Sequence, residues 1–232
     1  MLQRLSLVLF LTIGVVSTSA YAQSVMPAPA PPIIGATSYL AIDAQTGHEL
    51  AALDPDIPLA PASLTKIMTT YVVFKALQQE QIQLTDEVTI SEKAWRMPGS
   101  RMFVEVGKRV TIEDLLLGMI VQSGNDASVA LAEHIAGTEG VFAEMMNQYA
   151  QQLGMLSTHF VNSTGMPAEG HLTTARDLAT LARAMIAEFP DYYAWHAVRE
   201  FTFNEIKQSN RNKLLWRDAS VDGLKTGHTD DA

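Results

Sequence analysis

Ser63 and Lys66 lie three positions apart in the stretch PASLTKIM, residues 61–68, at the edge of an apolar run. Residues with this spacing share one face of a helix, so the Lys66 amine can reach the Ser63 hydroxyl. Lysine at its ordinary pKa is a poor base, but burial under apolar neighbours and a second cation such as Lys225 would both lower that pKa. A neutral amine could then take the serine proton, and the start of the helix would add a positive potential where an oxyanion forms. The pair therefore predicts nucleophilic catalysis by Ser63.

A purely structural role for the same pair is the alternative. Ser63 would cap the helix, and Lys66 would be a solvated residue of its first turn. Considered alone, the Ser-x-x-Lys spacing favours this alternative, because serine and lysine are common residues. Two further motifs reverse the preference.

The second motif is Ser123-Gly124-Asn125, in a polar loop between two apolar helices. A polar group that projects from such a loop could face a cleft. The alternative is a turn in which Asn125 or Asp126 caps the following helix, and this alternative is compatible with an active role.

The third motif is Lys225-Thr226-Gly227. It places a charge, a hydroxyl and a position without a side chain in a predicted strand, so a substrate backbone could approach at Gly227 and pair with the strand edge. The alternative is an ordinary edge strand that a lysine protects from aggregation. Each motif is weak alone, whereas the three in this order form a specific set.

The elements that must position these motifs are predicted as helices between strands. A hairpin is predicted over residues 37–53, and short strands and loops over residues 87–110. A helix with one buried face is predicted from Leu64 to Gln78, and a helix buried all round from Thr111 to Ser123. Two further helices end at Gly137 and Gly154, and a last one runs from Thr174 to Phe189, before Pro190. Towards the C-terminus, EFTFNEI alternates like a strand, NRNKLLWRD is a polar turn, and VDGLKTGHT begins a strand. This order predicts one sheet in which the N- and C-terminal strands meet, covered by helices.

The first 36 residues are predicted to lie outside the fold. Residues 1–22 contain Arg4, an apolar stretch from residue 5 to residue 16, and then Ala20-Tyr21-Ala22, which is the pattern of a secretory signal peptide cleaved before Gln23. A membrane-spanning helix is the alternative, but it needs about 20 apolar residues. Residues 23–36 form a Pro/Ala-rich leader. The chain is therefore expected to be exported from the cytoplasm.

Composition excludes several classes of function. The net charge is −9 and no Lys/Arg cluster stands out, so nucleic acid is not an expected partner. The chain contains no cysteine, which excludes disulfides and a lipid-bearing cysteine. The histidines other than His228 show no HExxH or paired metal spacing, so they are interpreted as surface or structural residues and no metal site is expected.

Together the three motifs form the signature of serine beta-lactamases and penicillin-binding proteins. The chain resembles the low-molecular-mass penicillin-binding proteins that are D-alanyl-D-alanine carboxypeptidases, close to the enterobacterial type 5 and type 6 enzymes. It shares with them the stretches IVQSGNDASVALAEHIAG, TTARDLATLARAM, EFTFNEIKQSNRNKLLW and VDGLKTGHT. The resemblance covers nearly all of the chain from about Thr37. It implies an α/β (α+β) fold of the beta-lactamase/transpeptidase type over residues 37–232, with an antiparallel sheet covered by helices and a helical subdomain.

The resemblance also implies a role for each motif residue. Ser63 is acylated by the penultimate D-alanine of a peptidoglycan pentapeptide, and Lys66 takes its proton. Ser123 passes the proton to the departing D-alanine, and Asn125 holds the substrate amide. Lys225 and Thr226 recognise the terminal carboxylate beside Gly227, while the backbone N–H groups of Ser63 and His228 form the oxyanion hole. No cofactor is implied, and penicillins are expected to inhibit by forming an acyl-enzyme that deacylates slowly.

Two alternatives stay open. A beta-lactamase would need a carboxylate that activates the deacylating water, and the nearest match is Glu169 in the stretch EGHLT, which ends in threonine where asparagine is typical. An inactive truncated fragment is the second, because the chain stops at Ala232, five residues past Gly227. The similar carboxypeptidases continue with further strands of the sheet, a closing helix, a small beta domain and an amphipathic helix that anchors them to the outer face of the inner membrane. The expectation is thus an incomplete sheet, no anchor, and an activity that the sequence leaves open.

Overall fold

The structure is a computed structural model, and it describes residues 33–229. The predicted signal peptide, residues 1–22, and the leader up to residue 32 lie outside the described residues. Within the described part, none of the helices is long and apolar enough to cross a membrane.

The predicted N-terminal hairpin is confirmed. β1 (Tyr39–Ile42) pairs antiparallel with β2 (Glu49–Leu53), and Tyr39 lies opposite Leu53. Arg183 fixes the connecting turn from outside, since its guanidinium donates to the Ala44 and Gln45 carbonyls at 2.9 and 3.3 Å. The hairpin is thereby attached to the helix that carries Arg183.

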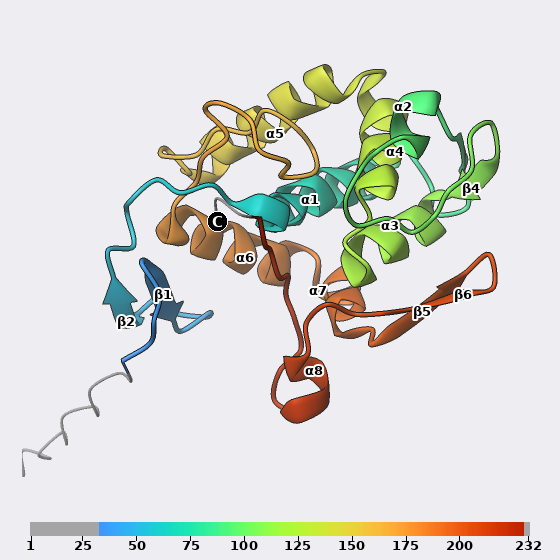
Figure 1. Ribbon diagram of the computed structural model, residues 1–232. Coiled ribbons are helices and arrows are strands. Elements are labelled where there is room, and N and C mark those ends of the chain that lie inside the picture. The colour runs from blue at the N-terminus through green and yellow to red at the C-terminus, as the bar shows by residue number, and fades with distance from the viewer. Residues whose placement is uncertain (1–32, 230–232) are drawn as a thin grey trace, which may run out of the picture. The chain divides into compact units, whose positions relative to one another are not determined.

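Four long helices surround a central one (Figure 1). The central helix is α1 (Thr65–Gln78), and its neighbours are α3 (Ile112–Val121), α4 (Asn125–Ala136), α5 (Glu139–Leu153) and α6 (Ala175–Glu188). The prediction that α1 has one buried face is wrong, because helices pack on several sides of it and 11 of its 14 residues are buried. Its buried residues include polar ones, so polar groups near its start must find partners inside the protein.

The helix ends follow the signals in the sequence. The hydroxyls of Thr111, Thr138 and Thr174 accept from the backbone N–H of the third residue after each, at the starts of α3, α5 and α6. Gly137 and Gly154, with φ of 75° and 80°, end α4 and α5. These boundaries confirm the predicted positions of the helices.

Shorter elements connect the long helices. They are the 3₁₀ turns η1 (Ala62–Leu64) and η2 (Ala194–Ala197) and the one-turn helices α2 (Glu92–Trp95), α7 (Pro190–Tyr193) and α8 (Leu214–Arg217). The segment that contains α8 was predicted as a polar turn. It forms one helical turn. The Asn212 side chain accepts from the Leu214 N–H at 3.1 Å just before this turn, and the N-cap residue Lys213 makes no side-chain cap.

Residues 33–229 contain three separate two-stranded antiparallel sheets, and not one shared sheet. Besides the N-terminal hairpin, β3 (Glu87–Thr89) pairs with β4 (Arg109–Thr111), and β5 (Glu200–Phe203) pairs with β6 (Ile206–Ser209). The predicted meeting of N- and C-terminal strands is therefore not present in this part of the chain. Residues 221–229, predicted to begin a strand, form no ladder. Side chains occupy their carbonyls instead: Asn212 Nδ2 donates to Gly223 at 2.8 Å, and His196 Nδ1 donates to Leu224 at 3.1 Å.

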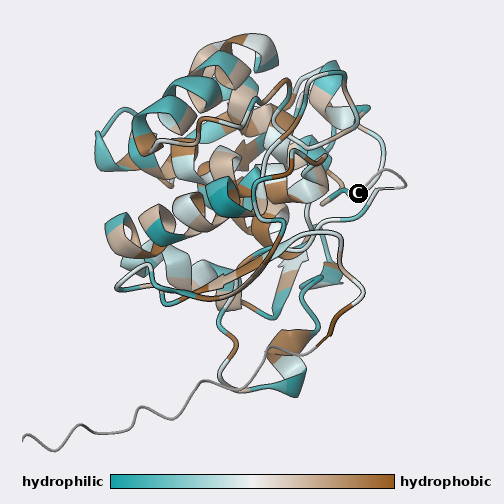
Figure 2. Cartoon of the chain, turned by 90° about the vertical axis from the view of Figure 1, so that its left-hand side faces the viewer, coloured by the Kyte–Doolittle hydropathy of each residue, from teal (hydrophilic) through white to brown (hydrophobic). Residues whose placement is uncertain are grey.

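Apolar side chains from all five long helices form one core. Figure 2 shows that these helices carry both hydrophobic and hydrophilic residues, and the hydrophobic ones lie where helices pack. Met68, Phe74, Leu115, Met119 and Phe142 are completely buried in it. This burial of apolar area is the main favourable contribution to the stability of the domain.

His171 is a buried, uncharged histidine beside the start of α1. Its Nδ1 accepts from the Val161 N–H at 2.9 Å, so Nε2 carries the proton and donates to Thr65 Oγ1 at 2.7 Å. A second proton would place two N–H groups against each other. Burial lowers the pKa of His171 from 6.5 to about 4, and likewise that of His196 to about 4.

The domain should therefore lose stability in acid. Between pH 6.5 and pH 4 these two histidines are protonated in the unfolded chain and neutral in the folded one. The free energy of unfolding therefore falls as the pH falls, by about 3 kcal/mol for each histidine. We expect His171→Asn, which keeps an acceptor for Val161, to remove about half of this pH dependence in urea denaturation measured across the range. Asn in place of the exposed His134 should leave it intact, and an unchanged pH dependence in His171→Asn would contradict this assignment.

Candidate active site

The Lys66 amino group is enclosed by three oxygen atoms. Lys66 is 1% exposed, and its Nζ lies 2.5 Å from the Thr164 carbonyl oxygen, 2.7 Å from Asn125 Oδ1 and 3.2 Å from Ser63 Oγ. These distances exclude the alternative in which Lys66 is a solvated first-turn residue. The Ser-x-x-Lys spacing does bring the amine to the serine.

The three oxygens are not equivalent. The Thr164 carbonyl and the Asn125 side-chain carbonyl can only accept hydrogen bonds, whereas the Ser63 hydroxyl can also donate. A neutral amine has two hydrogens and one lone pair. If the two short contacts take the hydrogens, the lone pair faces Ser63 Oγ. The geometry thus suits an amine that accepts the Ser63 proton.

The surroundings of Lys66 favour its neutral form. Burial holds the pKa of Lys66 well below its ordinary value, and the positive charge of Lys225 lowers it further. The carboxylates of Asp126 and Glu139 act in the opposite direction and are the weaker influence. Burial and Lys225 are the two causes that the sequence suggested for a lysine base.

Ser63 lies in the 3₁₀ turn that precedes α1, and it is not the cap of that helix. No side chain caps α1, whose N-cap position is Leu64. Two glycines approach the turn closely. A Cβ atom at Gly165 would lie 1.7 Å from the Ala62 carbonyl oxygen, and one at Gly227 would lie 3.2 Å from the Ser63 nitrogen. A Cβ atom at Gly165 would overlap the Ala62 carbonyl, so only glycine is allowed there, whereas at Gly227 the neighbours would have to shift by a few tenths of an ångström.

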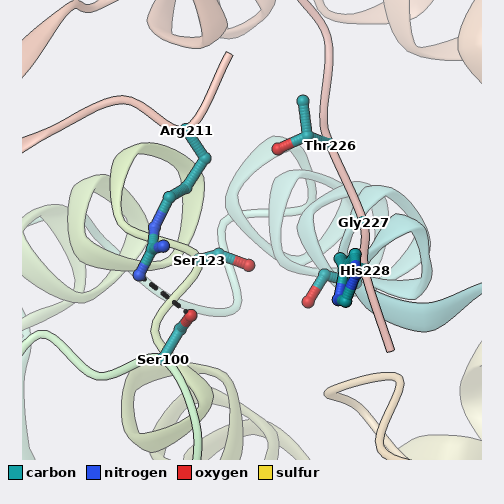
Figure 3. Close-up of a pocket in the computed structure, with 7 residues that line it drawn as sticks. Ser100, Ser123, Arg211, Thr226, Gly227 and His228 are labelled. Atoms are coloured by element: carbon teal, nitrogen blue, oxygen red, sulfur yellow. Dashed lines mark hydrogen bonds between the residues drawn. The ribbon is translucent and has the colours of Figure 1, made fainter. Parts of the chain in front are cut away.

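A cleft of about 270 Å³ opens at Ser63. Its lining comes from five separate parts of the chain and consists of Ser63, Ser100, Ser123, Arg211, Thr226, Gly227 and His228. Figure 3 shows Arg211 reaching across to Ser100, where its guanidinium donates to the hydroxyl at 3.2 Å. All three motifs thus contribute to one cleft.

Ser123 is held in an unusual backbone conformation. Its φ of 66° is left-handed, which serine adopts at a cost of about 1–3 kcal/mol. Its Oγ is buried and has no hydrogen-bond partner among the described residues, although the side chain lines the cleft. A strained residue with a free hydroxyl fits a site where a proton must be passed on.

Asn125 is engaged on both sides of its amide. Oδ1 accepts from Lys66, and Nδ2 donates to the Pro98 carbonyl at 2.7 Å. The following helix has no side-chain cap, so neither Asn125 nor Asp126 caps it. Asp126 instead accepts from the backbone N–H groups of residues 102–104. The contact of Asn125 with a substrate amide stays a prediction; Oδ1 has a second lone pair and Nδ2 a second hydrogen beyond these two bonds.

Residues 225–228 run past Ser63 without strand pairing. Thr226, Gly227 and His228 line the cleft, as the sequence suggests for a substrate-binding segment. Lys225 does not line it, because its ammonium donates to the Thr226 carbonyl at 2.7 Å. Burial and the nearby Arg211 lower the pKa of Lys225 to about 7. Carboxylate recognition by Lys225 and Thr226, and an oxyanion hole at Ser63 and His228, stay predictions.

The sequence motifs did not indicate four residues of the site. Thr164 contributes its backbone oxygen to Lys66. Such a contact depends on the conformation of a turn, and the type of side chain at residue 164 does not reveal it. Gly165 follows Asn162 in a pattern typical of an Asx turn, and this signal could have been found. Arg211 and Ser100 lie in polar stretches that resemble ordinary loops. Their position at the cleft depends on tertiary packing.

Glu169 is exposed and does not line the cleft. It therefore gains no support as a base for a deacylating water. Within residues 33–229, no group of three or more His, Asp or Glu side chains could hold a metal ion.

Comparisons with known proteins identify relatives of the chain. The profile of peptidase family S11, described as D-alanyl-D-alanine carboxypeptidase, matches residues 25–232. The D-alanyl-D-alanine carboxypeptidase DacA of Haemophilus influenzae is 44% identical, over 100% of this chain and 61% of that protein. The crystal structure of penicillin binding protein 5 from H. influenzae matches with a TM-score of 0.85 and 47% identity, over 88% of this chain and 60% of that one.

A more distant relative has a solved structure with a bound ligand. Penicillin-Binding Protein D2 from Listeria monocytogenes, solved in an ampicillin-bound form, matches with a TM-score of 0.75 and 27% identity, over 85% of this chain and 81% of that one. The structural matches confirm the fold class that the motifs suggested. The chain spans about three fifths of the length of the two H. influenzae relatives. It belongs to the D-alanyl-D-alanine carboxypeptidase family of serine peptidases, S11.

Proposed function

We propose that the protein is a serine D-alanyl-D-alanine carboxypeptidase that removes the terminal D-alanine from peptidoglycan pentapeptides. One observation carries the proposal: a buried lysine whose amine has two obligate acceptors and one serine hydroxyl as its neighbours, and that serine lines a cleft. Membership of the family supports the choice of substrate.

Acylation follows from this arrangement. Ser63 Oγ attacks the carbonyl carbon of the penultimate D-alanine, and its proton moves to Lys66 Nζ. A carbon–oxygen bond forms, the carbonyl oxygen becomes an oxyanion, and the peptide carbon–nitrogen bond then breaks. The leaving nitrogen takes a proton by way of Ser123, whose hydroxyl is otherwise unpartnered. An ester on Ser63 and free D-alanine are the products.

Hydrolysis of the ester completes the cycle. Lys66, neutral again, takes a proton from a water molecule, and the resulting hydroxide attacks the ester carbon. The tetrapeptide carboxylate leaves and Ser63 recovers its proton. Penicillins acylate the same hydroxyl and deacylate slowly, so they inhibit.

The cation in the cleft accounts for selectivity towards a free C-terminus. The Arg211 guanidinium lines the cleft together with the Thr226 hydroxyl. A guanidinium and a hydroxyl together match the donor pattern that a carboxylate requires. We assign the terminal carboxylate to this end of the cleft, with Lys225 adding positive charge from behind.

Export to the periplasm is part of the proposal. It rests on the predicted signal peptide and on the location of a peptidoglycan substrate outside the cytoplasm. A beta-lactamase function is not proposed, since Glu169 lies away from the cleft.

Replacement of Ser63 by alanine should abolish activity. The purified protein is expected to release D-alanine from an acyl-D-Ala-D-Ala peptide and to gain the mass of one penicillin on the peptide that contains Ser63. Ser63→Ala should show neither, while alanine in place of the exposed Ser157 should show both. Labelling that persists in Ser63→Ala would place the nucleophile elsewhere.

The acid limb of the acylation rate, which is the rise of the rate with pH on the acid side of its pH profile, should depend on the charge of Lys225. Neutral Lys66 is the reactive form, so the rate rises with pH through the pKa of Lys66. Lys225→Gln removes a positive charge that lowers this pKa, so the limb should move to higher pH. Lys225→Arg keeps a positive charge at every pH, so the limb should lie no higher than in the wild type. The first-order rate of acylation at saturating penicillin measures both, and identical limbs for Gln and Arg would show that residue 225 has no influence on Lys66.

A further inference from the structure

The carbonyl that holds Lys66 belongs to a turn that has its own supports. Asn162 Oδ1 accepts from the Thr164 N–H at 3.1 Å, the Thr164 hydroxyl at 3.0 Å and the Gly165 N–H at 2.7 Å. Asn162 thereby stabilises the turn by bonds within the turn itself. A locally closed turn still has to be attached to the helices that carry the rest of the site.

Ser163 provides that attachment. Its carbonyl accepts from Thr69 Oγ1 of α1 and from Ser128 Oγ of α4, both at 2.7 Å. Its N–H and its hydroxyl both donate to Glu139 Oε1, at 3.1 and 2.8 Å. Residue 163 is completely buried, so water could not satisfy its polar groups if any of these bonds were lost.

Glu139 is the charged member of this network. It is the first residue of α5, where the helix dipole favours a carboxylate, and it is 8% exposed. Its second oxygen pairs with Lys93 Nζ of α2 at 2.7 Å. Hydrogen bonds from Lys93 and Ser163 keep the pKa of Glu139 below its ordinary value in spite of burial, so Glu139 is ionised.

We propose that Glu139 is a positioning residue for the reaction: by holding Ser163 it places the Thr164 carbonyl against Lys66. The inference rests on the proposed function, since it concerns the same lysine. If Ser163 moves, the oxygen 2.5 Å from Lys66 Nζ moves with it. The amine then loses the acceptor that occupies one of its hydrogens, and its lone pair is no longer directed at Ser63.

Glu139 acts on Lys66 by charge as well. The charged groups that influence the amine are Lys225, which favours the neutral form, and Asp126 and Glu139, which favour the ammonium form. Loss of the negative charge at residue 139 should therefore lower the pH at which Lys66 becomes neutral. The positional and the electrostatic effects have separate signatures, so two substitutions can distinguish them.

The test compares Glu139→Gln and Glu139→Ala in the acylation of Ser63 by a fluorescent penicillin from pH 5 to pH 10. Gln keeps an acceptor for Ser163 but no charge, so the acid limb should move to lower pH while the plateau rate falls only a few-fold. Ala removes the acceptor, and the plateau rate per folded molecule should fall by about ten- to a hundredfold, the loss expected when a reacting group is misplaced. Gln in place of the exposed Glu144 on the same helix should match the wild type.

Each result decides something. Thermal unfolding and far-UV circular dichroism give the folded fraction, so a merely structural role would lower the melting temperature and leave the rate per folded molecule and the acid limb unchanged. That outcome overturns the inference. If Glu139→Ala does not fold, Glu139→Asp decides it: the shorter side chain keeps the charge but withdraws the acceptor from Ser163, so the plateau rate should fall while the acid limb stays in place, and an unchanged plateau rate overturns the inference. A wild-type protein that penicillin does not acylate would instead contradict the proposed function itself.

Discussion

Burial of one lysine amine is the constraint on which the rest of the structure depends. Transfer of an ammonium group into a protein interior is strongly unfavourable unless the group is paired or becomes neutral. Lys66 is surrounded by oxygen acceptors, and its carboxylate neighbours influence it less than burial does. The protein thus stabilises the neutral amine that a general base requires. Helices α1 and α4 and the turn at residues 162–165 each supply one part of this environment.

The supports of this environment explain polar groups that would otherwise be unfavourable inside a helical core. Thr69 and Ser128 are completely buried, and each donates to the Ser163 carbonyl. Asp126 uses its carboxylate to hold the backbone of residues 102–104, beside Ser100 at the cleft. A network of this kind specifies one arrangement of the helices, because each unsatisfied member would cost about 1–3 kcal/mol. The site and the fold are therefore stabilised by the same contacts.

Sequence reasoning found the parts of the fold and site that local signals determine. Helix boundaries at Thr111, Thr174, Gly137 and Gly154 depend on caps, and the Ser63–Lys66 contact depends on helical spacing. It missed what tertiary packing determines. The helix after Ser63 was predicted to have one buried face because periodicity cannot show how many neighbours pack on it. Residues 221–229 were predicted to begin a strand, although side chains satisfy the carbonyls of Gly223 and Leu224. Arg211 and the Thr164 carbonyl enter the site through contacts distant in sequence, which no motif encodes.

The protonation state of Lys66 is the property that most directly tests this account. With lysine labelled by ¹³C and ¹⁵N, the side-chain signal of Lys66 can be assigned by its loss in Lys66→Arg and followed by NMR across a pH titration of the folded protein. The account predicts a titration midpoint well below the value of about 10.4 that a solvated lysine shows. A midpoint at or above that value would show that the amine is charged at neutral pH, and Lys66 could not then be the base that activates Ser63.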